Sequence, residues 1–333
     1  MHETVNSRLE SIPEVQSAIT SGEPLFLAGS RAALAQLPKG NWVGGTIPYF
    51  MTEEGGLLSE DRIFVTRVKE FAIEAHAADY GPEELARLYT DAPEQGITFL
   101  ILPFGTAVHT AFAQKASSFD GFLLKPVVGW IAGVRVDLIG KEQPAVFNGK
   151  TGIVFEDRGV ALHVTLPANK LASLDIVNIF ESDGGALLRF EERSFHVGKC
   201  LVDGKIVDFA SYITDQKIST EFPLVGDYNG SSINVSIQAV DVAHGKVDLY
   251  APVVPGVEYH FAKPVYDYSE AFAKAIAKSD ACPDFACNCI LNYLYGKLEG
   301  KKTGPITGPI TFGEIAHLLL NQTMVRLYLH DIG

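Results

Sequence analysis

The segment GITFLILPFGTAVHTAFAQKASSF (residues 96–119), followed by PVVGWIAGVRV (126–136), decides the fold. Residues 96–105 form a continuous apolar run, which is typical of a central strand that is covered on both faces. Residues 106–119 are predicted to be helical, with Thr106 as the candidate N-cap. Residues 126–136 read as a second buried strand. This order predicts a βαβ crossover and a parallel strand pair in the N-terminal half.

The rest of the chain predicts a mixed fold. From residue 145 onward, strand-like runs alternate with Gly and Asp turns. A length of 333 residues makes two domains the default expectation. We therefore expect an α/β (mixed α+β) fold of two modules, 1–192 and 193–333, each a mixed sheet flanked by helices. Further helices are expected at PEVQSAI (13–19), SRAALAQL (30–37), YSEAFAKAIAKS (268–279) and GEIAHLLL (313–320).

The charge, the apolar segments and the cysteine content of the sequence argue against several classes of protein. The formal net charge of -13 argues against nucleic-acid binding, which needs clustered Lys and Arg. The N-terminal residues lack the basic start and apolar centre of a signal peptide. The most apolar segments are shorter than the roughly 20 residues that span a bilayer. Four cysteines in a chain of this length do not indicate a disulfide framework. These features predict a soluble, cytoplasmic protein with reduced thiols.

Three cysteines lie in or near DFACNCILNYLYG (284–296). The spacing of Cys282, Cys287 and Cys289 matches no common zinc pattern, and no histidine lies between residues 261 and 316. Buried free cysteine behaves as a small hydrophobic residue, which favours a core strand over a metal site. A nucleophilic Cys287 is the other alternative. It would require a base such as His317 and a lowered thiol pKa.

Two glycine-containing segments are candidate ligand sites. Gly105 and Thr106 stand where the buried strand meets the helix, and a helix N-terminus can bind anions; a tight, capped turn is the alternative. In NWVGGTIPYF (41–50), Gly45 would let the backbone approach a ligand while Thr46 offers a hydroxyl. A kink in a strand explains the same glycines equally well.

A third candidate is the segment PITGPITFGEIAHLL (305–319). Gly313 and Glu314 are predicted to open a helix, where a carboxylate is favoured by the helix dipole. Glu314 could equally hold the amine of a ligand, although the capping role is favoured.

The order of these segments resembles the FIST domains, which are paired N- and C-terminal modules of prokaryotic sensory proteins. The resemblance covers nearly the whole chain, through short motifs. In the N-terminal module they are GGT (44–46), FLILPFGTAVHTAF (99–112), PVVGWIAGV (126–134) and AVFNGKTGIVFEDRGVALHVTL (145–166). In the C-terminal module they are KCLVDGKIVDFASYI (199–213), FPLVGD (222–227), GKVDLYAPVVPGVEYHF (245–261), DFACNC (284–289) and ITFGEIA (310–316).

The resemblance implies a module that senses small molecules such as amino acids. It carries candidate ligand contacts onto Cys287, Gly313 and Glu314 in the C-terminal module, and onto Gly45 and Thr46 in the N-terminal one. Two departures stand out: Ile290 replaces the family's usual arginine, and Gly45 replaces its early cysteine. Both modules together use the 333 residues of this sequence, so we expect no attached effector domain.

We therefore expect a small-molecule-binding sensory protein without catalysis or a cofactor. Signalling would require a separate partner protein, and self-association into a homo-oligomer is left open. The alternative is a hydrolase or transferase that uses Cys287 as nucleophile and a histidine, such as His317, as base. Metal binding through the three cysteines is the weakest alternative.

Overall fold

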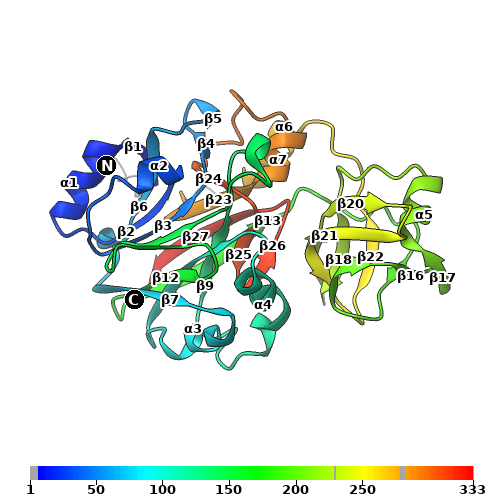
Figure 1. Ribbon diagram of the computed structural model, residues 1–333, viewed down its shortest axis with the longest axis horizontal. Coiled ribbons are helices and arrows are strands. Elements are labelled where there is room, and N and C mark those ends of the chain that lie inside the picture. Colours follow the sequence, from blue (N-terminus) through cyan, green and yellow to red (C-terminus); the bar gives the residue numbers. More distant parts are fainter. Residues whose placement is uncertain (1–6, 229, 278–281, 333) are drawn as a thin grey trace.

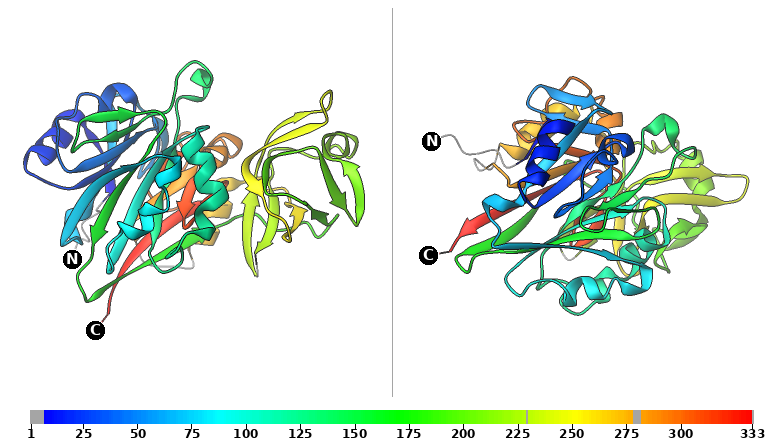
Figure 2. Two further views of the ribbon diagram at one scale, coloured as in Figure 1. Left: turned by 60° about the horizontal axis from the view of Figure 1, so that its bottom comes forward. Right: turned by 60° about the vertical axis from the view of Figure 1, so that its left-hand side comes forward.

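The computed structural model describes residues 7–228, 230–277 and 282–332, which form a large body and a smaller lobe (Figure 1). The small lobe is built from one continuous stretch, whose strands run from residue 188 to residue 261. Residues 178–187 and 262–267 connect it to the body. Both ends of the chain lie on the body, away from the small lobe (Figure 2). The mixed α/β class expected from the sequence is confirmed.

Three six-stranded sheets form the body. The first contains, in spatial order, β1 (Ser7–Ser11), β6 (Arg62–Arg67), β2 (Leu25–Gly29), β3 (Trp42–Thr46), β10 (Val146–Asn148) and β11 (Ile153–Phe155). The second contains β26 (Leu318–Leu320), β25 (Glu314–Ala316), β9 (Val127–Ala132), β8 (Gly96–Pro103), β12 (Gly159–Thr165) and β7 (Glu74–Tyr80). The third contains β13 (Lys170–Val177), β27 (Met324–Asp331), β23 (Phe285–Cys289), β24 (Gly308–Thr311), β4 (Tyr49–Thr52) and β5 (Gly55–Leu58).

Short helices cover these sheets. The α-helices of the body are α1 (Ile12–Thr20), α2 (Arg31–Leu34), α3 (Arg87–Thr90), α4 (Ala107–Lys115), α6 (Tyr268–Ile276) and α7 (Ile290–Tyr295). Single 3₁₀ turns lie at Val68–Glu70, Pro82–Glu84, Ala116–Ser118 and Val136–Leu138. The helices expected at 13–19, 30–37 and 268–279 are present as α1, α2 and α6; residues 278 and 279 of the last lie outside the described residues.

The predicted βαβ unit is confirmed. β8 and β9 pair in parallel, with Leu100 opposite Gly129, and α4 crosses between them. Thr106 caps α4, because its hydroxyl accepts a hydrogen bond from the backbone N–H of His109. The apolar run in β8 is buried, as expected for a strand that is covered on both faces.

The core of the body lies where its three sheets meet. Phe26 from the first sheet, Phe99 from the second and Phe285 from the third are buried against one another. Their ring centroids are 4.9 to 5.7 Å apart, within the range of favourable aromatic pairs. One contiguous core cluster therefore joins segments from both halves of the sequence.

The small lobe has its own core. One sheet contains β17 (Lys205–Asp208), β16 (Lys199–Val202), β14 (Leu188–Arg189), β22 (Glu258–Phe261), β18 (Leu224–Tyr228) and β19 (Ser231–Val235); the other contains β15 (Ser194–Val197), β21 (Lys246–Val253) and β20 (Ile237–Asp241). The helix α5 (Phe209–Asp215) packs against them. Phe190 packs on Phe209 and Tyr259, and all three are buried.

The sheets of the body do not follow the expected division between residues 192 and 193. β25 pairs with β9, β24 pairs with β4, and β27 pairs with β13, so each pairing joins the two expected modules. The physical reason is that strands near residue 300 complete sheets begun by strands from the first half. The chain therefore folds as a body interrupted by an inserted lobe, and not as two consecutive modules.

The helix expected at residues 313–320 is wrong. β25 and β26 form a tight antiparallel hairpin there, and His317 occupies its turn with φ of +58°. The apolar side chains of this segment are compatible with a helix. The segment instead forms β25, which pairs with the edge of β9, and this sheet pairing overrides the local helical propensity. Cys287 and Cys289 do lie in a strand, β23, whereas residues 290–295 continue as α7.

Candidate functional site

Cys287 and Glu314 come together in a buried polar cluster, which we call the Glu314 cluster; it also contains Cys289, Thr311 and Thr323. Glu314 is fully buried. Its Oε2 accepts hydrogen bonds from the Thr323 hydroxyl at 2.8 Å and the Thr323 N–H at 3.3 Å. Its Oε1 has no partner among the described residues. Burial raises the pKa of Glu314 to about 8, so this carboxyl group is protonated at neutral pH.

The two cysteines of β23 are buried beside this carboxyl group. The thiol of Cys287 donates to the carbonyl of Gly129 at 3.5 Å. Burial, reinforced by Glu314, raises the pKa of both Cys287 and Cys289 well above the usual range. A catalytic thiol requires the opposite shift. Cys287 therefore has the environment of a core residue.

His317 does not supply the base that the cysteine alternative requires. Its Nδ1 lies 3.0 Å from the carbonyl of Phe122, and its ring packs on that of Phe122. Within the described residues, no hydrogen bond joins His317 to Cys287. Nor do these residues contain a group of three His, Cys, Asp or Glu side chains that could hold a metal ion. Cys282 is exposed, whereas Cys287 and Cys289 are buried.

We predict that iodoacetamide at neutral pH modifies Cys282 of the folded protein and reacts with Cys287 at least about 100-fold more slowly. The reason is that the Cys287 side chain is buried and little of it is in the thiolate form. Mass spectrometry of the peptides after timed exposure measures both rates. Protein unfolded in urea is the control, in which the two cysteines should react alike. Equal rates in the folded protein would contradict the buried position and restore the nucleophile alternative.

Gly45 and Thr46 are occupied by the packing of the first sheet. A Cβ on Gly45 would lie 2.6 Å from Ile101 and 2.7 Å from Trp130, so no space for a ligand remains there. The Thr46 hydroxyl accepts a hydrogen bond from the N–H of Ala145 at 2.9 Å. These two residues join β3 to its neighbours. Gly313, just before β25, also has a structural role, because its φ of +153° favours glycine at that position.

Gly105 stands at the surface, at the start of α4. Its φ of +75° favours glycine, and its N–H donates to Nδ1 of His109 at 3.3 Å. The Thr106 hydroxyl donates in turn to the carbonyl of Pro103 at 2.8 Å. Thr106 therefore serves as a helix cap, while Gly105 and His109 are held together by a backbone-to-ring hydrogen bond.

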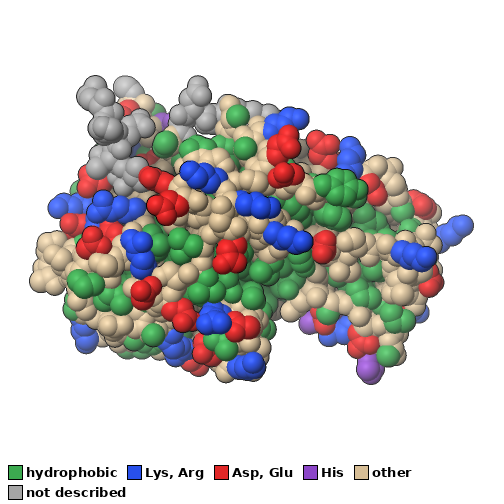
Figure 3. Space-filling view, turned by 90° about the horizontal axis from the view of Figure 1, so that it is seen from above, with side chains coloured by type: hydrophobic (Ala, Val, Ile, Leu, Met, Phe, Trp, Pro, Cys, Tyr) green, Lys and Arg blue, Asp and Glu red, His purple; other side chains and the backbone are tan. Residues whose placement is uncertain are grey.

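A cavity of about 330 Å³, which we call the interlobe pocket, opens between the body and the small lobe. In the space-filling view the surface is hollowed between the two lobes (Figure 3). The residues of the body that line the interlobe pocket are Phe104, Gly105, His109, Thr110 and Gln114. Its lining from the small lobe comprises Ser194, Phe195, His196, Gln238, Leu249 and Tyr250. Of the residues expected from the sequence, Gly105 lines this pocket.

His109 is the residue of the pocket that sequence reasoning missed. Its side chain is buried between the rings of Phe104 and Phe195, at centroid distances of 5.6 and 6.0 Å. Its Nε2 is buried and has no partner among the described residues. Burial lowers the pKa of His109 to about 4, so the ring is neutral. The signal in the sequence is a histidine in the first turn of the helix, four residues after Gly105.

A family model described as a family of unknown function, DUF6976, matches residues 10–330. The chain belongs to this family. No curated protein matches this DUF6976 chain. The matched region includes both lobes and the pocket between them. Among its described residues, no helix has the length and apolar character needed to cross a membrane.

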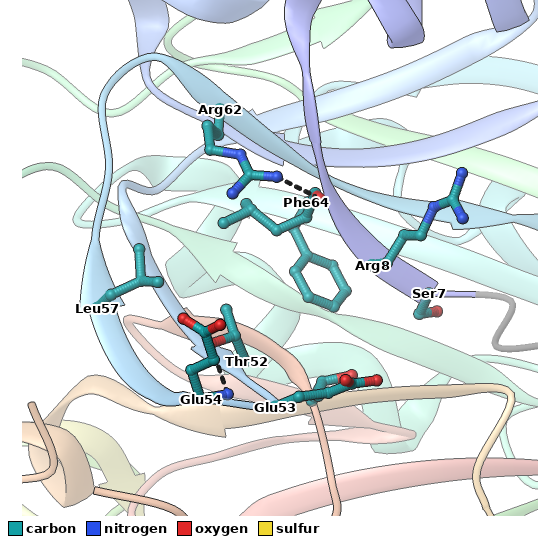
Figure 4. Close-up of a pocket in the computed structure, with 10 residues that line it drawn as sticks. Ser7, Arg8, Thr52, Glu53, Glu54, Leu57, Arg62 and Phe64 are labelled. Carbon is teal, nitrogen blue, oxygen red and sulfur yellow. Dashed lines mark hydrogen bonds between the residues drawn. The ribbon is translucent and has the colours of Figure 1, made fainter. Parts of the chain in front are cut away.

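The DUF6976 chain has a second cavity, of about 510 Å³, which we call the edge pocket (Figure 4). It lies between β1, β6 and the β4–β5 hairpin, and the Phe64 ring points into it. Arg62 donates to the carbonyl of Leu9 at 2.9 Å, while Glu53 and Glu54 are exposed. In the described part of the chain, no buried unpartnered side-chain atom belongs to this lining. The interlobe pocket is therefore the better candidate site.

Proposed function

We propose that this protein binds a small molecule in the interlobe pocket. The observation that carries the proposal is the cavity itself, of about 330 Å³ and lined by residues of both lobes, among them His109, whose Nε2 is buried and unpartnered. Leaving a buried polar atom without a partner costs about 1–3 kcal/mol. Buried polar groups without a partner are uncommon in native structures, so each of them calls for an explanation.

The location of the pocket supports the same proposal. Ligand sites favour junctions between domains and the carboxyl ends of parallel strands. The pocket lies just beyond Pro103, where β8 of the parallel pair ends, and beside the first turn of α4. Its volume falls in the range of about 300–1,000 Å³ that is usual for small-molecule sites.

A sensory role is part of this proposal, and the resemblance to FIST domains supports it. A ligand that contacts both lobes favours one arrangement of the lobes over others, which a separate partner protein could recognise. We include a cytoplasmic location in the proposal, and we leave open whether the protein forms homo-oligomers. Ligand binding of this kind requires no nucleophile, so the cysteine-based alternative has less support from the buried Cys287.

Thermal-shift screening tests the proposal. We expect at least one compound from a panel of amino acids, small carboxylic acids and uncharged amides to raise the melting temperature. At a concentration of 100 Kd, a ligand stabilises the native state by about 2.7 kcal/mol. Replacing the half-buried Thr110 with Trp fills the interlobe pocket, so this stabilisation should disappear in Thr110→Trp.

Thr52→Trp is the matched control, because Thr52 lines the edge pocket and is also half-buried. This variant should respond to the ligand as the wild type does. Stabilisation that survives in Thr110→Trp and disappears in Thr52→Trp would place the ligand in the edge pocket. A panel without any stabilising compound would count against ligand binding itself.

A further inference from the structure

A further cavity, of about 190 Å³, lies between α4 and β26 of the body and β19 and β21 of the small lobe; we call it the Arg193 pocket. Its lining is mostly aliphatic, with Ala113 and Leu319 on the side of the body and Val235 on the side of the small lobe. Among its described lining residues, only Ser117 is exposed. An apolar cavity of about 150 Å³ can hold a benzene ring, so this one has space for a chain or ring of about six carbons.

Arg193 is the one charged residue among those that line this pocket. Its Nη1 donates to the carbonyl of Ala113, across the junction of the lobes, at 3.5 Å. No Asp or Glu of the described residues forms an ion pair with it. Its Nε and Nη2 have no hydrogen-bond partner in the described part of the chain, and both have accessible surface, unlike the enclosed Nε2 of His109. The guanidinium therefore has donors that a ligand can reach.

Two other polar side chains of the lining are already bonded within the protein. The buried Asn234 amide donates to and accepts from the amide of Asn178, at 3.0 and 2.9 Å. The hydroxyl of Tyr228 is hydrogen-bonded to that of Tyr259 at 2.9 Å. Burial raises the pKa of Tyr228, against smaller opposing effects of Tyr259 and of the nearby positive charge of Arg193, so this hydroxyl stays protonated. Arg193 alone therefore sets the charge that the pocket favours in a ligand.

We propose that the Arg193 pocket binds a small apolar monocarboxylate, whose carboxylate pairs with the Arg193 guanidinium and whose hydrocarbon part fills the aliphatic cavity. The planar fork of a guanidinium matches the two oxygens of a carboxylate. An ammonium group on the same molecule would have no acidic partner in the lining, so an amino acid fits less well. The Arg193 pocket shares no lining residue with the interlobe pocket, and this inference does not depend on the proposed function.

A series of probes built on one chain tests the proposal: hexanoate, hexanamide, norleucine and acetate. Isothermal titration measures the affinity of each for the full-length protein. Hexanoate should bind at least about tenfold more tightly than hexanamide, because hydrogen bonds between charged groups are the stronger ones. Norleucine, which is hexanoate with an added ammonium group, should bind more weakly than hexanoate. Acetate should bind roughly 100-fold more weakly, because it lacks the four methylene groups that fill the cavity.

Variants of the lining separate the charge of Arg193 from its packing. Arg193→Met keeps an apolar stem, so it should bind hexanoate and hexanamide equally, whereas Arg193→Lys should retain part of the preference for hexanoate. Arg189→Met is the matched control, because Arg189 is an exposed residue of the same lobe that pairs with Glu258 outside the lining. It should bind hexanoate as the wild type does. Ile233→Trp fills the pocket from β19 and should abolish binding of both probes while Arg193 is retained.

The remaining outcomes overturn the inference. Equal affinities of hexanoate and hexanamide for the wild type would remove the role of Arg193, and tighter binding of norleucine would show that the ligand class is wrong. Hexanoate binding that survives in Ile233→Trp but is lost in Thr110→Trp would lie in the interlobe pocket, which would refute this site and support the proposed function. If no probe binds, this inference fails, while the thermal-shift screen with Thr110→Trp still decides the proposed function.

Discussion

Between about pH 5 and pH 8, the wild-type protein is expected to lose roughly 3–4 kcal/mol of unfolding free energy relative to Glu314→Gln. Burial raises the pKa of Glu314 from 4.5 to about 8, so the folded protein holds a proton that the unfolded chain releases. The stabilising contribution is fully present below pH 4.5. It declines as the pH rises and is lost once the pH passes about 8.

Gln at position 314 can keep the acceptor for Thr323 but cannot ionise. The comparison with wild type also removes two opposing effects. Burial lowers the pKa of His109 and of His163 to about 4, so these residues destabilise the folded state as the pH falls from 6.5. Both histidines are present in both proteins. Their contribution therefore cancels in the difference.

Urea unfolding of both proteins at a series of pH values measures the effect. Glu54→Gln is the control, because Glu54 is exposed and its variant should follow the wild type. Parallel curves for the wild type and Glu314→Gln would mean that Glu314 has an ordinary pKa, and hence that the Glu314 cluster is open to water.

Gly129→Ala is expected to cost at least about 4 kcal/mol of stability, or to prevent folding. Gly129 has φ of +158° at the centre of β9, opposite Leu100. A Cβ there would lie 1.8 Å from the Leu100 carbonyl oxygen. That atom is backbone in the central strand, so it cannot move aside without breaking the β8–β9 pairing. The Gly129 carbonyl also accepts from Cys287, so the Glu314 cluster would be disturbed.

Gly140→Ala is the matched control. Gly140 also has a positive φ, +80°, but a Cβ there would meet nothing within 4 Å. This variant therefore isolates the backbone strain, at about 1–2 kcal/mol. Circular dichroism during thermal unfolding compares the two variants. Equal losses would show that the contact with Leu100 is relieved at little cost.

Local patterns predicted local structure well. The apolar run in β8, Thr106 as the cap of α4, and the strand at β9 all follow from neighbours in sequence, and all three are confirmed. Glu314 lies where local reasoning fails. Its segment has helical composition, yet it forms a strand because the edge of β9, almost 200 residues earlier, is available for pairing. No local pattern contains that information.

The candidate site was predictable only in part. Gly105 was identified because a glycine between a strand and a helix has a local meaning. His109 was not, because its importance depends on burial by Phe195, which belongs to the other lobe. Cys287 and Glu314 were both expected from the sequence to contact a ligand, and the structure places them beside each other. Their burial, which suppresses reactivity at both, depends on the meeting of the second and third sheets.

The insertion of the small lobe has a consequence for synthesis on the ribosome. When residue 262 has emerged, the lobe has all its strands, but β9, β4 and β13 of the body still lack β25, β24 and β27. Those apolar edges wait until residues 308–331 have been synthesised. The lobe can therefore mature first, while the body remains exposed to misassociation and to chaperones until those later strands emerge.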